Sequence, residues 1–156
     1  MQGYRSFAFI GGYDGASTSR DRRKGFVSRL EERGIQHCPV IGTAFTYEGG
    51  KEGFRQLLKQ EGKCPEALFC VSDLVSAGVL DCARYEYELK VPDDVAIIGF
   101  DDIELASYSA YSITSFVQPM DSMIEKALAL LLAEDNTENP TNLALFPCTL
   151  KTRETA

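Results

Sequence analysis

Residues 95–100 (Val-Ala-Ile-Ile-Gly-Phe) form an apolar run of strand length in which no polar residue alternates with the hydrophobic ones. A strand of this kind is covered on both faces, which is typical of a parallel sheet. Pro92 and the two Asp residues after it predict a turn just before the strand. Asp101 and Asp102 follow it directly. Because a doubly wound sheet binds its ligand beyond the carboxyl ends of its strands, these two carboxylates are predicted to lie at a ligand-binding edge.

Strand and helix signals alternate through the first hundred residues. Strands are predicted at residues 7–10, 40–41, 67–71 and 95–100. Helices are predicted between them at residues 17–33, 46–58 and 73–85, with Ser17-Thr18-Ser19, Thr46 and Ser72-Asp73 as candidate caps. This order predicts an α/β fold built on a doubly wound parallel sheet with right-handed crossovers.

The pattern changes after Asp102. An irregular stretch rich in Tyr and Ser leads to a predicted strand at residues 113–117, a strongly apolar helix at residues 121–133 and a last strand at residues 143–150. The helix carries more apolar surface than one sheet face covers, so the chain is expected to self-associate.

The composition excludes several classes of protein. With 156 residues, the chain is long enough for one domain or for parts of two lobes, and its net charge of −7 does not favour binding to a phosphate backbone. No apolar window approaches the roughly 18 residues that a membrane span requires. The five cysteines are scattered and form no Cys-x-x-Cys pair, which argues against a zinc site and a disulfide framework. We therefore expect a cytoplasmic protein without a metal or other cofactor.

The polar and aromatic residues at the predicted strand ends suggest a binding site. The four strands end at Gly12, Phe45, Ser72 and Asp101, and the helix that starts from the same edge brings in Thr18 and Arg22. Arg22 shares a helix face with Phe26 and Leu30, so its guanidinium is predicted to face inward and to need a partner. An arginine, a carboxylate, two hydroxyls and an aromatic ring suit a polar organic ligand. No nucleophile has an adjacent base, so the chain is not expected to be an enzyme.

Five segments together resemble one family. They are Arg22-x-x-Gly25-Phe26, Ala67-Leu68-Phe69-Cys70-Val71-Ser72-Asp73 with Ala77-Gly78, residues 91–102, Ile113-Thr114-Ser115 leading to Gln118-Pro119, and Leu150-x-x-Arg153-x-Thr155. As a set they resemble the effector-binding region of the lactose-repressor and purine-repressor family of bacterial transcription regulators. That family has the type I periplasmic-binding-protein fold, which is Rossmann-like. The resemblance covers about the last half of such a protein.

The resemblance implies a domain organisation and partners. Residues 1–107 would be the carboxyl-terminal lobe, residues 108–143 a crossover, strand and helix of the amino-terminal lobe, and residues 144–156 the last strand and tail. One complete lobe and elements of a second would thus be present. The family binds a small sugar-like or nucleobase-like effector between its lobes, forms homodimers, and contacts DNA through a headpiece that is expected to be missing from these residues.

The resemblance also implies site residues. Arg22 and Asp101 match the pair that binds the effector, and Phe45 matches a stacking aromatic residue. Thr18 and Ser72 match positions that line the pocket, and Gln118 lies near the crossover. One departure is Glu88, which stands where the family commonly has glycine, so a left-handed helix cap is not expected there.

Other interpretations stay open at this point. Asp101 could cap a helix, Arg22 could pair with Asp101 without any ligand, Phe45 could be plain core, and Ser72 could serve mainly as a helix cap. Two other functional classes are a periplasmic sugar-binding lobe of an ABC transporter and a doubly wound nucleotide-binding enzyme. The enzyme class would require a phosphate-binding glycine motif, and the three glycines at residues 11–15 do not have the spacing of that motif.

Overall fold

The computed structural model describes residues 3–13, 15–132 and 144–156. In these residues the elements follow the order β1 (Phe7–Gly11), α1 (Ser17–Glu31), β2 (Val40–Gly42), α2 (Tyr47–Glu61), β3 (Ala67–Cys70), α3 (Asp73–Asp81), η1 (Cys82–Glu86), β4 (Ala96–Phe100), η2 (Glu104–Ser107), β5 (Thr114–Val117), α4 (Met120–Leu132) and β6 (Thr149–Lys151). The six strands form one sheet in the order β2-β1-β3-β4-β5-β6. All neighbours pair in parallel except β5 and β6, which are antiparallel. The predicted α/β class with a doubly wound parallel sheet is confirmed.

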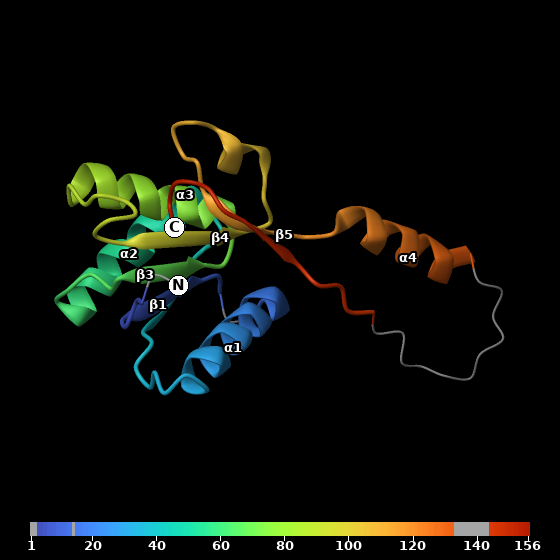
Figure 1. Cartoon of the computed structure of the whole chain (residues 1–156), viewed down its shortest axis with the longest axis horizontal. Coiled ribbons are helices and arrows are strands. Elements are labelled where there is room, and N and C mark those ends of the chain that lie inside the picture. The colour runs from blue at the N-terminus through green and yellow to red at the C-terminus, as the bar shows by residue number, and fades with distance from the viewer. Residues whose placement is uncertain (1–2, 14, 133–143) are drawn as a thin grey trace.

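Helices cover the sheet from both sides. Helix α1 lies on one face, whereas α2 and α3 lie on the other, and α4 projects away from this body (Figure 1). The central strands supply fully buried side chains such as Phe9, Leu68 and Ile97, against which Phe54 and Leu57 of α2 pack in one core. Burial of central strands on both faces explains why their sequences are apolar without alternation.

Two of the three predicted helix caps are confirmed. The hydroxyl of Thr46 accepts a hydrogen bond from the Gly49 amide at 2.9 Å, and Ser72 caps α3. The prediction for α1 was wrong, because its N-cap is Ala16, which makes no side-chain cap bond. The hydroxyl of Ser19 instead accepts a bond from the Gly12 amide at 3.1 Å, so it ties α1 back to the end of β1.

The expectation at Glu88 was also wrong. Its φ angle of 55° is in the left-handed region, although a side chain disfavours this conformation. The amide of Leu89, the next residue, donates to the Ala83 carbonyl at 2.9 Å, which ties the turn at Glu88 back to η1. The terminus of η1 thus imposes the conformation despite the missing glycine.

The strand predicted for a second lobe lies in this sheet. Strand β5 pairs with β4, with Ile98 opposite Thr114 and Phe100 opposite Phe116. The predicted placement of this strand in another lobe was therefore wrong, because β4 offers it a free edge. The last strand is shorter than predicted and begins at Thr149, since β5 offers a partner only as far as Val117. Residue 143, where this strand was predicted to start, and the end of the predicted helix at residue 133 lie outside the described residues.

The carboxyl-terminal residues fasten β4 to β5. Thr155 is fully buried; its hydroxyl donates to the Ile97 carbonyl at 2.7 Å and accepts from the Thr114 amide at 2.9 Å. One side chain thereby satisfies two backbone groups on neighbouring strands.

We predict that Thr155→Ala lowers the free energy of unfolding by about 1–3 kcal/mol, because it leaves the buried Thr114 amide unpaired. Urea unfolding measures this change. Thr152→Ala is the matched control, since Thr152 is exposed three residues earlier in the same segment. Equal effects of the two substitutions would contradict the fastening role.

Candidate ligand-binding site

Arg22 of α1 and Asp101, which follows β4, form a partly buried ion pair. Nη2 of Arg22 lies 3.1 Å from Oδ1 of Asp101, and the two side chains are 15% and 29% exposed. Nη1 of Arg22 donates to the Val71 carbonyl at 2.6 Å. Its guanidinium carbon lies 3.7 Å from the centre of the Phe100 ring, in cation–π contact. The inward orientation that the helix spacing predicted for Arg22 is thus present.

Gln118, which follows β5, joins the same carboxylate. Its side-chain amide donates to Oδ1 of Asp101 at 2.6 Å. Arg22 and Gln118 therefore share one oxygen of Asp101. The described residues donate no hydrogen bond to the other oxygen, Oδ2, although a carboxylate accepts at both. This arrangement leaves a half-buried acceptor available to a ligand.

The backbone at Asp101 is in an uncommon conformation. Asp101 and Asp102 have φ angles of 105° and 52°, which cost roughly 1–3 kcal/mol each in residues other than glycine. Asp102 is anchored by Arg153 and by Lys151, whose Nζ lies 3.3 Å from its carboxylate. The N-cap of η2 is Ile103, without a side-chain cap bond, so Asp101 does not cap this helix; its side chain instead contacts Arg22 of α1 and Gln118 after β5.

Phe100 was not predicted as part of the site. Neighbouring residues of a regular strand point to opposite faces, so Phe100 and Asp101 would not both reach one arginine if the strand continued. The positive φ at Asp101 breaks this alternation and lets both reach Arg22. The adjacent Asp-Asp pair was the only signal in the sequence, because Asp tolerates the left-handed region better than most residues.

Phe45 precedes α2 and packs its ring against the end of β1. A Cβ atom at Gly12 would come within 1.9 Å of this ring, so the position accepts no side chain. The exposed ring of Tyr13 meets Phe45 edge-on, with centroids 5.9 Å apart. Phe45 is half-buried and is not part of the fully buried core. Tyr13 was not predicted as part of this site.

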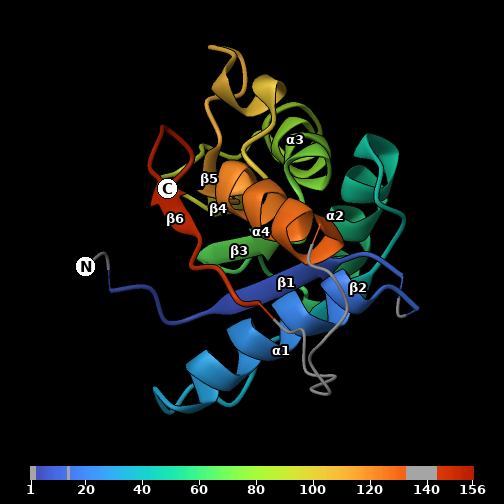
Figure 2. The same ribbon diagram turned by 90° about the vertical axis from the view of Figure 1, so that its right-hand side faces the viewer.

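The remaining two predicted residues have other positions. Thr18 is exposed in the first turn of α1. Ser72 is buried, and its hydroxyl accepts from the Val75 amide at 3.4 Å, which confirms its capping role. The contacts thus join Arg22, Asp101 and Gln118 directly, whereas Thr18, Phe45 and Ser72 share with them only the carboxyl edge of the sheet. That edge faces the viewer in Figure 2.

An apolar hollow of about 420 Å³ lies beside Arg22, between α1 and the strands. Phe26, Phe69, Phe100 and Phe116 line it together with Cys148. This hollow was not predicted from the sequence, because its walls come from α1, three strands and the segment before β6. Arg22 is itself among the residues that line it.

Comparison with known proteins places the chain in a family. The model of the periplasmic binding protein-like domain matches residues 1–156. The chain belongs to this family. The relatives of the chain include regulators of the kind that its sequence motifs resemble. Within the described residues, no helix is long and apolar enough to cross a membrane.

Three relatives illustrate the similarity. The HTH-type transcriptional repressor PurR of Yersinia enterocolitica is 31% identical over 99% of this chain and 46% of its own length. A sugar-binding LacI-family regulator of Escherichia coli, solved with phosphate, has a TM-score of 0.85 and 27% identity over 99% of this chain and 55% of that one. A CelR–cellobiose complex has a TM-score of 0.80 and 27% identity over 99% and 47%. The chain thus spans about half the length of these relatives.

We predict that Asp101→Asn lowers the free energy of unfolding by about 1–2 kcal/mol, because it removes the charge that Arg22 faces. Glu32→Gln is the matched control, since the Arg29–Glu32 pair of the same helix is largely exposed and should contribute less than about 0.5 kcal/mol. Urea unfolding of both variants measures the difference. A loss at Asp101 no larger than that at Glu32 would show that the pair is a solvated surface contact.

Proposed function

We propose that this chain is the ligand-sensing part of a bacterial transcriptional regulator and that it binds a small sugar-like or purine-like effector. The observation that carries the proposal is the Arg22–Asp101–Gln118 cluster, in which one carboxylate oxygen is shared and the other is available. The named relatives are regulators and repressors, which favours this function over a transport-type sugar-binding lobe. The role is binding, without catalysis.

The proposed chemistry follows from the donors and acceptors of the cluster. A ligand hydroxyl or ring N–H donates to Oδ2 of Asp101, and the Arg22 guanidinium donates to a ligand oxygen or ring nitrogen. The Phe45 ring offers an apolar surface on which a sugar or base can stack. Thr18, Ser72 and Gln118 add contacts at the rim of the same edge. The bound cellobiose of the CelR complex supports a sugar as one candidate.

The rest of the regulator is also proposed from its relatives, because this chain spans about half their length. We propose that α4 belongs to a second lobe that covers the effector. We propose further that the protein works in the cytoplasm and contacts DNA through residues outside this chain. The net charge of −7 agrees with a chain that does not itself hold DNA.

We predict that Asp101→Ala weakens effector binding by about 10- to 100-fold, because a charge-assisted hydrogen bond contributes roughly 1.5–3 kcal/mol. Calorimetric titration with cellobiose, ribose, glucose, guanine and hypoxanthine identifies a ligand and measures the change. Asp94→Ala is the control, because Asp94 precedes β4 at the opposite end of the strand. Unchanged affinity with a lowered melting temperature would leave Asp101 a purely structural residue.

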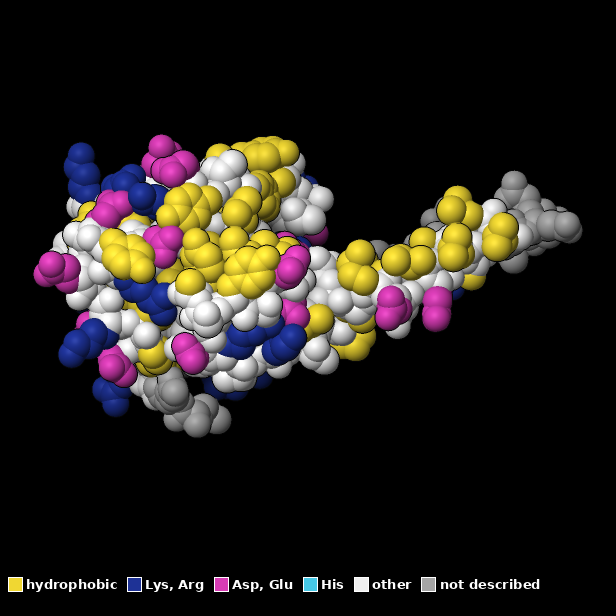
Figure 3. Space-filling model, turned by 90° about the horizontal axis from the view of Figure 1, so that it is seen from above, with side chains coloured by type: hydrophobic (Ala, Val, Ile, Leu, Met, Phe, Trp, Pro, Cys, Tyr) yellow, Lys and Arg dark blue, Asp and Glu magenta, His cyan; other side chains and the backbone are white. Residues whose placement is uncertain are grey.

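Helix α4 supports a second proposal, which is self-association of this chain. None of its residues is buried, and Ile124, Leu128 and Leu131 are 51%, 52% and 80% exposed. Their spacing places them on one face of the helix. Figure 3 shows hydrophobic side chains along the projecting helix. An apolar surface of this kind is stabilised by contact with another protein surface.

We predict that the chain exceeds its monomer mass in light scattering at tens of micromolar. Replacing both Ile124 and Leu128 by Glu should restore the monomer, because charges replace the apolar face. Ser122→Glu is the matched control; it adds a charge two residues from Ile124, away from that face, and should leave the association intact. A wild-type chain that is monomeric at this concentration would contradict the proposal.

A further inference from the structure

Asp73, the first residue of α3, carries a fully buried carboxylate that the proposed binding chemistry does not use. The hydroxyl of Ser115 in β5 donates to its Oδ1 at 2.6 Å, and the Ile103 amide donates to its Oδ2 at 2.9 Å. Gly99 of β4 makes room for it, because a Cβ atom there would come within 2.1 Å of Oδ1. The carboxylate is thus enclosed between α3, β4 and β5.

The donors to Asp73 hold the turn that carries Asp101. Ser115 Oγ, which donates to Asp73, also accepts from the Asp102 amide at 3.2 Å. The amides of both residues after Asp101 are therefore tied to Asp73, that of Ile103 directly and that of Asp102 through Ser115. The φ angles of 105° and 52° at Asp101 and Asp102 are uncommon, so this turn needs such bonds to persist.

We propose that Asp73 is a positioning residue of the effector site, which holds the Asp101–Asp102 turn so that the Asp101 carboxylate faces Arg22 and Gln118. The inference rests on the proposed function only where it says that the positioned Asp101 carboxylate binds an effector. The contacts that carry it lie within the chain itself.

The position of Asp73 makes the turn sensitive to pH. Burial, together with the nearby Asp101 and Asp102, raises the pKa of its carboxyl to about 6, although the bonds from Ser115 and Ile103 act in the opposite direction. Among the described residues, the titratable or charged groups around this corner include Cys70 beside Asp73, Glu104 next to Ile103, Arg22 on Asp101, and Lys151 and Arg153 on Asp102.

Protonation of Asp73 turns one acceptor oxygen into a donor, while both oxygens already receive hydrogen bonds. The contact at the protonated oxygen must then change: either the Ile103 amide loses its charged acceptor, or the Ser115 hydroxyl turns so that it accepts from Asp73. The turn is held at pH values above about 6, where the carboxylate is ionised, and it loosens as the pH falls through this value. The bond from Gln118 to Asp101 weakens in the same range.

A purely structural role for Asp73 makes a different prediction. An acidic residue in the first turn of a helix stabilises that helix through its dipole and does nothing to a glutamine that follows a strand elsewhere in the sheet. A readout at Gln118 therefore separates the two roles, because its side-chain amide bonds to Asp101 and makes no contact with Asp73 among the bonds described.

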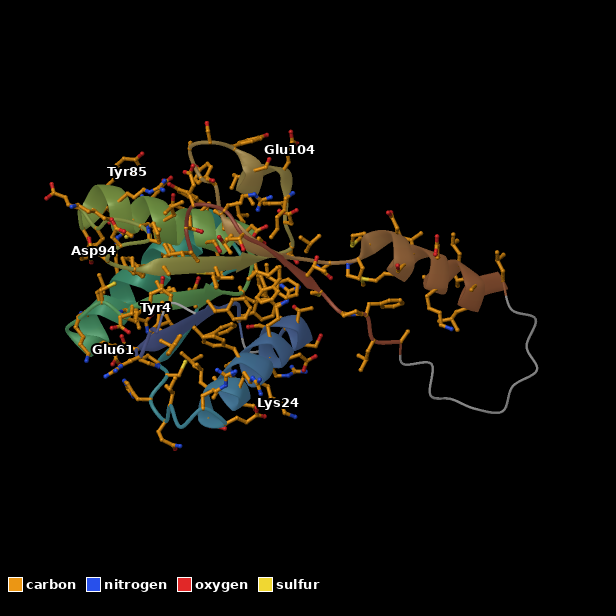
Figure 4. All side chains as sticks on the ribbon, viewed as in Figure 1. Tyr4, Lys24, Glu61, Tyr85, Asp94 and Glu104 are labelled. Atoms are coloured by element: carbon orange, nitrogen blue, oxygen red, sulfur yellow. The ribbon has the colours of Figure 1, made fainter. Side chains whose placement is uncertain are left out.

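The test is ¹H–¹⁵N NMR of the 156-residue chain as the pH is lowered from neutral through about 6. We expect the Gln118 side-chain amide and the backbone amides of Asp102 and Ile103 to shift with one common midpoint. Asp73→Asn should abolish this titration and leave the Gln118 signal near its low-pH position. Asp94→Asn is the matched control, because among the described hydrogen bonds exposed Asp94 accepts one within its own turn, from the Lys90 amide. Figure 4 shows Asp94 well apart from Glu104 of η2, the helix that follows the Asp101–Asp102 turn.

Two results would overturn the proposal. One is an Asp73→Asn chain that melts at a lower temperature but keeps the wild-type Gln118 signal. The other is the absence of a common midpoint in the wild type, a measurement that needs no variant and so remains decisive if Asp73→Asn fails to fold. Ser115→Ala should displace the Asp102 amide signal whether or not Asp73→Asn folds, because it removes the hydroxyl that accepts from that amide. If the titration occurs and none of the sugars or bases binds, the proposed function fails while the positioning role stands.

Discussion

The structure at the carboxyl edge of this sheet depends on the contacts of the Arg22 guanidinium. It reaches from α1 to the carbonyl that follows β3 and to the carboxylate that follows β4, while it covers the Phe100 ring. Three elements are thereby fixed by one planar group, which a lysine with a single point charge does not reproduce. Gln118 extends the connection to the end of β5.

Parallel pairing explains why residues distant in sequence meet there. Because β1 to β5 run in the same direction, the segments after each strand emerge at one edge, and this edge receives Gly12, Phe45, Ser72, Asp101 and Gln118. Local patterns were enough to predict this, since apolar runs, helix caps and their alternation are properties of short segments. The caps at Thr46 and Ser72 and the inward orientation of Arg22 are confirmed on this basis.

The features that the sequence did not reveal depend on contacts between distant segments. The placement of β5 depends on the free edge of β4, and the shortness of β6 depends on the length of β5. The cation–π contact of Phe100 requires the positive φ at Asp101, and that turn is held by Asp73, 28 residues earlier in the chain. Ser17-Thr18-Ser19 looked like a cap, yet Ser19 bonds to Gly12, because the end of β1 lies beside it.

The central claim is that Arg22 and Asp101 bind the effector together. A crystal structure of the chain with the sugar or base that binds it most tightly tests this directly. The account predicts ligand atoms within hydrogen-bond distance of Oδ2 of Asp101 and of the Arg22 guanidinium, with an apolar ligand face on the Phe45 ring. A ligand bound elsewhere, with the Arg22–Asp101 contact closed and unshared, would contradict it.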